Sequence, residues 1–111
     1  MSRRRRRVRV VPVELHVASY RTRQWWERGE LHRVDGGPAV EYANGTREWW
    51  ELGELHRGGG LPAVEDVDGY RAWWEYDELH RCGGLPAVEC ADGSREWYER
   101  GRLVRREEVS S

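Results

Sequence analysis

The chain has 111 residues, seven Trp, no Phe, 38% apolar residues and a formal net charge of −1. This length suits one domain, and the low apolar content excludes a large aliphatic core, so aromatic side chains must supply most of the buried area. No stretch approaches 18 apolar residues, so we expect no transmembrane helix. We also expect no secretory signal, because the apolar run after the first arginines is short and contains a proline.

The first nine residues form a basic arm, and the rest of the chain is acidic, with 13 Arg against 20 Asp and Glu. The arm carries six arginines: Arg3, Arg4, Arg5, Arg6, Arg7 and Arg9. Three interpretations stay open: charges that protect an exposed edge strand, a solvated tail, or a binding site for nucleic acid or another polyanion. Alternation of Arg and Val from Arg7 favours a strand, which Pro12 restricts to a sheet edge or a strand start.

Residues 10–24 are a degenerate copy of the unit that follows, and they lack its Asn-Gly or Asp-Gly turn. Terminal repeats are commonly atypical because they cap the array. We therefore predict that this segment is an N-terminal cap.

From residue 25 to residue 104 the sequence repeats every 24 residues, which is typical of a repeat architecture. About four units fit, and residues 105–111 would form a C-terminal tail. The most regular positions are held by tryptophan, leucine and histidine: Trp25, Trp49, Trp73 and Trp97; Leu31, Leu55, Leu79 and Leu103; His32, His56 and His80.

Each unit contains two hairpin signals, for which Leu52-Gly53 and Asn44-Gly45 are examples. Both are predicted as two-residue turns, whose central residues need positive φ. The arrangement that allows units to stack has two strand lines per unit, where a strand line is one extended course of the chain across the sheet. A Trp-Trp strand would pair with its own Leu-His-Arg segment on one side and with the preceding Ala-Val-Glu segment on the other. The Gly-Gly-x-Pro sequence would divide the second line. The predicted fold is all-β, an elongated single-layer antiparallel sheet of stacked hairpins.

Two-residue turns also predict which side chains share a face, because side chains alternate along a strand. Trp50 would lie opposite Leu55, and Trp49 would lie opposite both His56 and Val40. One face would carry the leucines with Trp26, Trp50, Trp74 and Tyr98. The other face would carry the remaining tryptophans and the histidines, together with Val40, Val64 and Val88.

The histidine row is the most obvious candidate for chemistry. Equivalent histidines would lie two strands apart, about 9–10 Å, which is too far for two ligands of one ion because metal–nitrogen bonds are about 2.0–2.1 Å. We therefore predict no metal site and no cofactor, with each histidine packed beside its tryptophan. Glu41, Glu65 and Glu89 can pair with the repeated arginines in a solvated lattice of ion pairs.

The turn glycines and the Gly-x-Arg-Glu-Trp-Trp-x-x-Gly-x-Leu-His-Arg pattern resemble tryptophan-rich repeats of actinobacterial and phage proteins, and more distantly MORN repeats. The resemblance covers residues 25–103. It implies hairpin units stacked in a single sheet and a role as a scaffold for protein or lipid contact. The Gly-x-Pro kink and the doubled tryptophan depart from the MORN pattern.

The preferred function is a non-enzymatic scaffold that binds a protein, with a second copy of the chain as one option. The predicted binding face comprises Trp25, Trp49, Trp73, Trp97, His32, His56 and His80. The alternative is tethering to nucleic acid or an anionic surface through the arginine arm. Cys82 and Cys90 fall outside the repeat pattern and are expected to be free thiols. They favour a cytoplasmic location, in the host cell if the protein is phage-encoded.

Overall fold

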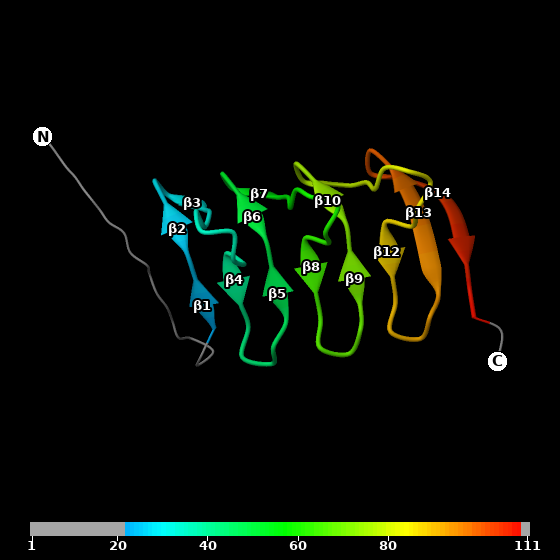
Figure 1. Cartoon of the computed structure of the whole chain (residues 1–111), viewed down its shortest axis with the longest axis horizontal. Helices are drawn as coiled ribbons and strands as arrows, with labels where there is room; N and C mark the ends of the chain where they lie inside the picture. The colour runs from blue at the N-terminus through cyan, green and yellow to red at the C-terminus, as the bar shows by residue number, and fades with distance from the viewer. Residues whose placement is uncertain (1–21, 110–111) are drawn as a thin grey trace, which may run out of the picture.

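The structure, a computed structural model, describes residues 22–109, which form strands and turns without a helix. The strands make an open antiparallel sheet of repeated hairpins that does not close into a barrel (Figure 1). The expected all-β fold is confirmed. Nothing within the described range is a helix that could cross a membrane.

Eight strands form the main sheet in the order β1-β4-β5-β8-β9-β12-β13-β14, and three two-stranded hairpins extend it along one side. The main-sheet strands are β1 (Arg23–Gln24), β4 (Val40–Glu41), β5 (Arg47–Glu48), β8 (Val64–Glu65), β9 (Arg71–Ala72), β12 (Val88–Glu89), β13 (Arg95–Glu99) and β14 (Arg102–Glu107). The hairpins are β2 (Trp26–Glu27) with β3 (Glu30–Leu31), β6 (Trp50–Glu51) with β7 (Glu54–Leu55), and β10 (Trp74–Glu75) with β11 (Glu78–Leu79).

The second strand line of each unit is divided into two halves by the Gly-Gly-x-Pro loop, as predicted. Both halves lie on the same side of their tryptophan strand. Trp49 shows this, because its N–H donates to the carbonyl of Ala63 at 2.8 Å and its own carbonyl accepts the N–H of His56 at 3.1 Å. The Ala-Val-Glu half therefore pairs with tryptophan strands on both sides, as β8 does with β5 and β9. Both predicted pairings are present, and the contact of the Ala-Val-Glu half with a second tryptophan strand is additional.

The Leu52-Gly53 turn has two residues, as expected. Both residues have positive φ, 51° and 82°, and Trp50 lies opposite Leu55. These values fit a type I′ turn, whose twist matches that of the strands it joins.

The Asn44-Gly45 turn differs from the prediction, because its loop has three residues. The N–H of Tyr42 donates to the carbonyl of Thr46 at 2.9 Å, and Gly45 has positive φ of 96° whereas Asn44 does not. The Asn44 side-chain oxygen accepts the N–H of Thr46 at 2.9 Å. This is the common three-residue hairpin loop, in which a residue with left-handed φ follows a type I turn.

The extra loop residue shifts the register by one. Val40 lies opposite Glu48 instead of Trp49, and Ala39 takes the place opposite Trp49. A shift of one residue moves side chains to the other face of a strand. The three repeated valines therefore share the face of Trp50, and the prediction that they lie beside Trp49 was wrong.

The hairpin of the last unit contains a bulge. Trp97 pairs with Arg105 and Tyr98 pairs with Leu103, so Val104 is an extra residue in β14. Two residues of a bulged strand lie opposite one residue of its partner. In the second unit the equivalent pair is His56 and Arg57, and the hydrogen bond between His56 and Trp49 described above fits that arrangement.

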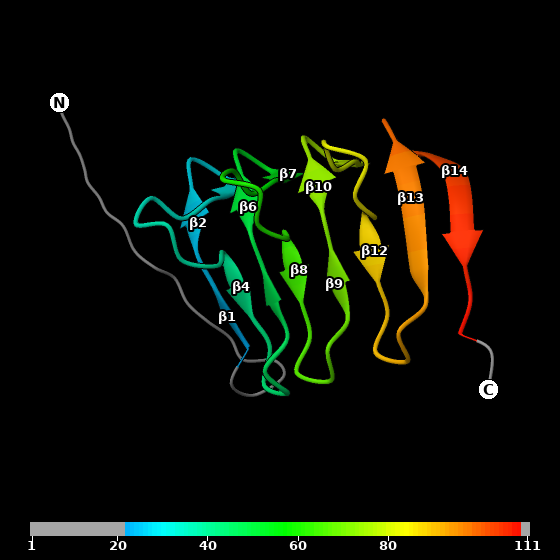
Figure 2. The ribbon, with the colours of Figure 1, turned by 45° about the vertical axis from the view of Figure 1, so that its right-hand side comes forward.

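The buried core comprises a row of alternating tryptophan and alanine on one face of the sheet, and Val40, Ala72 and Val88 on the other face. Ala39, Ala63 and Ala87 are 0% exposed, and Trp49 and Trp73 are each 7% exposed. Each alanine lies between the tryptophans of two successive units, where a larger side chain would meet both indoles. The loops that lead into β4, β8 and β12 stand away from the plane of the strands (Figure 2).

The boundaries of the array differ slightly from the expected ones at the C-terminus. Strand β14 ends at Glu107, so residues 105–107 of the expected tail belong to the sheet. Only residues 22–24 of the expected cap are described, and they contain β1. The basic arm lies outside the described residues.

Replacing Ala63 by Val should lower the free energy of unfolding by about 1–3 kcal/mol, because added methyl groups strain a filled site. Urea denaturation followed by tryptophan fluorescence measures the change. Ala91→Val is the matched control, because Ala91 is exposed in a turn where the preceding unit has Val67. Equal stability of the two variants would show that the row is not tightly packed.

Candidate docking face

Loops of the protein itself cover part of the face predicted to bind a partner. The indole N–H of Trp49 donates to the carbonyl of Gly36 at 3.1 Å, and that of Trp73 donates to the carbonyl of Gly60 at 2.9 Å. Trp97 repeats the bond with Gly84 at 2.9 Å. Each loop is therefore held over the face by the tryptophan of the next unit.

An arginine covers each of these indoles. The guanidinium carbon of Arg57 lies 3.6 Å from the ring centroid of Trp49, and that of Arg81 lies 3.7 Å from the centroid of Trp73. At these distances a cation is attracted to the ring face. Arg57 also donates to the carbonyl of Pro62 at 3.1 Å, so the same side chain covers the ring and fixes the loop.

A ladder of alternating charge crosses this face next to the tryptophan row. Paired residues along the main sheet are Arg23, Glu41, Arg47, Glu65, Arg71, Glu89, Arg95 and Glu107. Each acid also meets the arginine that covers a ring. Glu65, for example, lies 2.9 Å from Arg47 and 3.2 Å from Arg57. The expected pairing of Glu41, Glu65 and Glu89 with the repeated arginines is confirmed.

The histidines connect neighbouring units, which the sequence did not predict. Nδ1 of His32 accepts the backbone N–H of Leu52 at 3.0 Å, and Nδ1 of His80 accepts that of Arg100 at 3.1 Å. His56 likewise accepts from Tyr76 at 3.3 Å, and the two rings stack with centroids 3.9 Å apart. Each of the three histidines therefore binds the turn of the next unit.

This bond falls on a strained residue. Leu52, Tyr76 and Arg100 each open a turn with positive φ, 51°, 48° and 48°. Residues other than glycine seldom adopt this conformation. The histidine of one unit therefore stabilises the least favourable backbone position of the next.

The opposite face carries a strip of aromatic and leucine side chains that are partly or fully exposed. We name it the open strip: Trp26, Leu31, Trp50, Leu55, Trp74, Leu79, Tyr98 and Leu103. Trp26 and Leu103, at its two ends, are 46% and 44% exposed, and the six residues between them are partly exposed. The sequence analysis placed these residues together on one face but assigned binding to the other.

Acidic groups border the open strip. The indole N–H of Trp50 donates to Glu48 at 2.9 Å, and the hydroxyl of Tyr98 donates to Glu96 at 3.2 Å. Burial raises the pKa of Tyr98, and the Glu96 carboxylate raises it further. Tyr98 therefore stays neutral at physiological pH and remains a donor. These carboxylates hold the polar ends of the rings, so the apolar parts of the strip face outward.

The remaining predicted residues give less information. The six arginines of the arm lie outside the described residues, so polyanion binding stays a prediction. Cys82 and Cys90 are both free thiols, as expected.

A shallow hollow near the first turns is lined by Arg23, Glu41, Tyr42, Ala43, Gly45 and Arg47. Its one carboxylate, that of Glu41, is already paired with Arg23 and Arg33.

Comparison of the sequence with protein-family models, with curated proteins and with solved structures finds no match. The resemblance to MORN repeats therefore stays a prediction.

Replacing His56 by Val should destabilise the fold by about 1–2 kcal/mol, since the Tyr76 N–H loses its acceptor and the Tyr76 ring loses its stacking partner. Urea denaturation measures the loss. Valine is the natural residue at the equivalent position of the last unit, Val104.

The reverse substitution, Val104→His, is the control. Within residues 22–109 no turn of a following unit lies where it could donate to this position, so we expect no gain in stability. A gain similar in size to the loss in His56→Val would show that the histidine acts within its own unit.

Proposed function

We propose that this protein is a non-enzymatic repeat scaffold that binds another protein through the open strip. The observation that carries the proposal is the contrast between the two faces. On one face loops and arginines bury Trp49 and Trp73, each 7% exposed, whereas the strip on the other face has Trp26 and Leu103 exposed at its ends and no buried member. Exposed apolar patches with a polar rim mark contact sites.

The composition of the open strip fits an interaction surface. Tryptophan and tyrosine supply much of the binding energy at protein interfaces, because they combine a large apolar area with one polar group. Three tryptophans, one tyrosine and four leucines recur at regular spacing, so an elongated partner could make the same contact several times. Avidity would then strengthen weak single contacts.

The charge of the described residues indicates the chemistry of the partner. Residues 22–109 contain 12 Arg and 19 Asp or Glu, and Glu48 and Glu96 border the strip. A partner with exposed apolar side chains and a positively charged rim would complement this surface. A second copy of this chain lacks that complementarity within residues 22–109, so we favour a different protein.

The chemistry of the charged groups supports a role without catalysis. General acid–base catalysis needs a group held near its substrate with a suitable pKa. The carboxylates of the charge ladder are instead paired with arginines, and Glu48 and Glu96 hold the polar ends of strip residues. The two free thiols fit the proposed cytoplasmic location.

The test replaces the two exposed ends of the strip together, as Trp26→Arg with Leu103→Arg. Introduced charge should repel a positively charged partner and disrupt the apolar contact. We expect recovery of the partner by affinity capture from the host lysate, measured by quantitative mass spectrometry, to fall at least about tenfold, which corresponds to about 1.4 kcal/mol.

The matched control is Val34→Arg with Val67→Arg. These valines are 77% and 72% exposed but lie in loops away from the strip, so capture should be retained. Equal capture by all three proteins would refute docking on the strip. Capture that survives both double substitutions but is lost when Arg3–Arg7 are changed to Gln would favour the polyanion alternative.

A further inference from the structure

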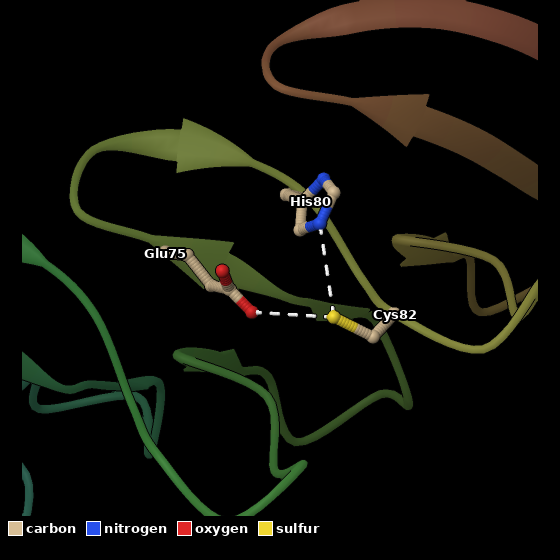
Figure 3. A group of neighbouring side chains, drawn as sticks. All are labelled: Glu75, His80 and Cys82. Atoms are coloured by element: carbon tan, nitrogen blue, oxygen red, sulfur yellow. Dashed lines mark hydrogen bonds between the residues drawn. The ribbon is translucent and has the colours of Figure 1, made fainter.

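The third unit brings together three side chains that can bind a metal ion. Glu75 lies at the end of β10, His80 follows β11, and Cys82 opens the next loop. One ligand atom from each lies within 4.8 Å of the others. Figure 3 shows the three side chains pointing toward one another, with the sulfur between the carboxylate and the imidazole.

The other units contain only part of this set. In the first unit Nε2 of His32 lies 3.6 Å from Glu27, and in the second unit Nε2 of His56 lies 3.9 Å from Glu51. The cysteine position, however, is occupied there by valine or glycine. Cys82 thus adds a third donor to an acid–histidine pair that the repeat already provides, and it does so once.

The distances are close to those of a tetrahedral zinc site. Sγ of Cys82 lies 3.8 Å from Nε2 of His80 and 4.0 Å from Oε2 of Glu75. With Zn–S bonds of about 2.3 Å and Zn–N or Zn–O bonds of about 2.0–2.2 Å, ligand atoms of one tetrahedral ion are roughly 3.5–3.6 Å apart. The two distances from the sulfur would need to shorten by only a few tenths of an ångström, and the carboxylate and imidazole atoms start within 4.8 Å of each other. Because Cys82 is exposed, water can take the fourth position.

We propose that Glu75, His80 and Cys82 form a mononuclear site for a divalent ion of the zinc class. Thiolate with imidazole favours zinc over magnesium or calcium, which prefer oxygen ligands. Binding releases the proton of the Cys82 thiol to solvent, because the thiolate is the ligand.

Metal binding at this site competes with the hydrogen bond between His80 of the third unit and Arg100 of the fourth unit. Nδ1 of His80 now accepts the N–H of Arg100, so the imidazole proton lies on Nε2. For Nε2 to bind an ion, this proton must move to Nδ1, and the N–H of Arg100 then loses its acceptor. Arg100 also lies 3.4 Å from Glu75 through its guanidinium. The ion would therefore loosen the last turn of the array.

The test titrates the full-length protein with Zn²⁺ by calorimetry and with Co²⁺ by absorbance. We expect one ion per chain and a thiolate-to-cobalt charge-transfer band in the near ultraviolet. Cys82→Gly should weaken Zn²⁺ binding at least tenfold and remove the band. Glycine occurs naturally at the same position of the second unit, so this variant should fold. Cys90→Ala is the control and should bind as the unchanged protein does.

A second readout separates this site from a metal held by the thiol alone. Hydrogen exchange at the Arg100 amide should become at least several times faster when Zn²⁺ is bound, and should not respond to Zn²⁺ in Cys82→Gly. A missing charge-transfer band, equal affinity in Cys82→Gly, one ion per two chains, or unchanged Arg100 exchange would each overturn the proposal.

Discussion

The hydrogen bond from the indole N–H of each inner tryptophan to a glycine carbonyl of the preceding loop determines which face of the sheet is closed. A single sheet has no second layer to cover its apolar side chains. Here the loop held by Trp49 or Trp73 takes that role, and the arginine stacked on the ring completes the cover. Because loop and ring belong to successive units, no unit can close its face alone. The stability of the array therefore depends on neighbouring units more than on any single hairpin.

Much of the fold could be predicted from the 24-residue period and the turn residues. The period indicated stacked units, and the division of the second strand line followed from Gly-Gly-x-Pro. The strand register was harder to predict, because Asn-Gly is compatible with hairpin loops of two or three residues. Side-chain hydrogen bonding by Asn44, and the absence of positive φ there, favoured the longer loop. The extra loop residue places Ala39, instead of Val40, opposite Trp49. The alanines therefore lie on the face of Trp49 and the valines on the face of Trp50.

The docking face could be predicted only in part, because it depends on contacts between residues that are distant in the sequence. The sequence correctly grouped Trp50 with Leu55 and separated both from Trp49. It could not show that the loops fold back over Trp49, because that depends on contacts between residues 13 positions apart, such as Trp49 and Gly36. Spacing alone suggested the row of tryptophans as the binding surface. The structure leaves the row of mixed aromatic and leucine side chains more open.

The departures from the repeat are consistent with the bonds between units. Histidine occupies its position in the three units whose following turn donates an N–H to it, and Val104 stands at the equivalent position of the last described unit. In the same unit, β14 runs from Arg102 to Glu107 without the intervening loop. Asp77 replaces a turn glycine at a φ of 69°, and its side chain accepts the N–H of Leu55 in the preceding unit. At both positions, the residue that departs from the repeat stands where the structure places a contact between units.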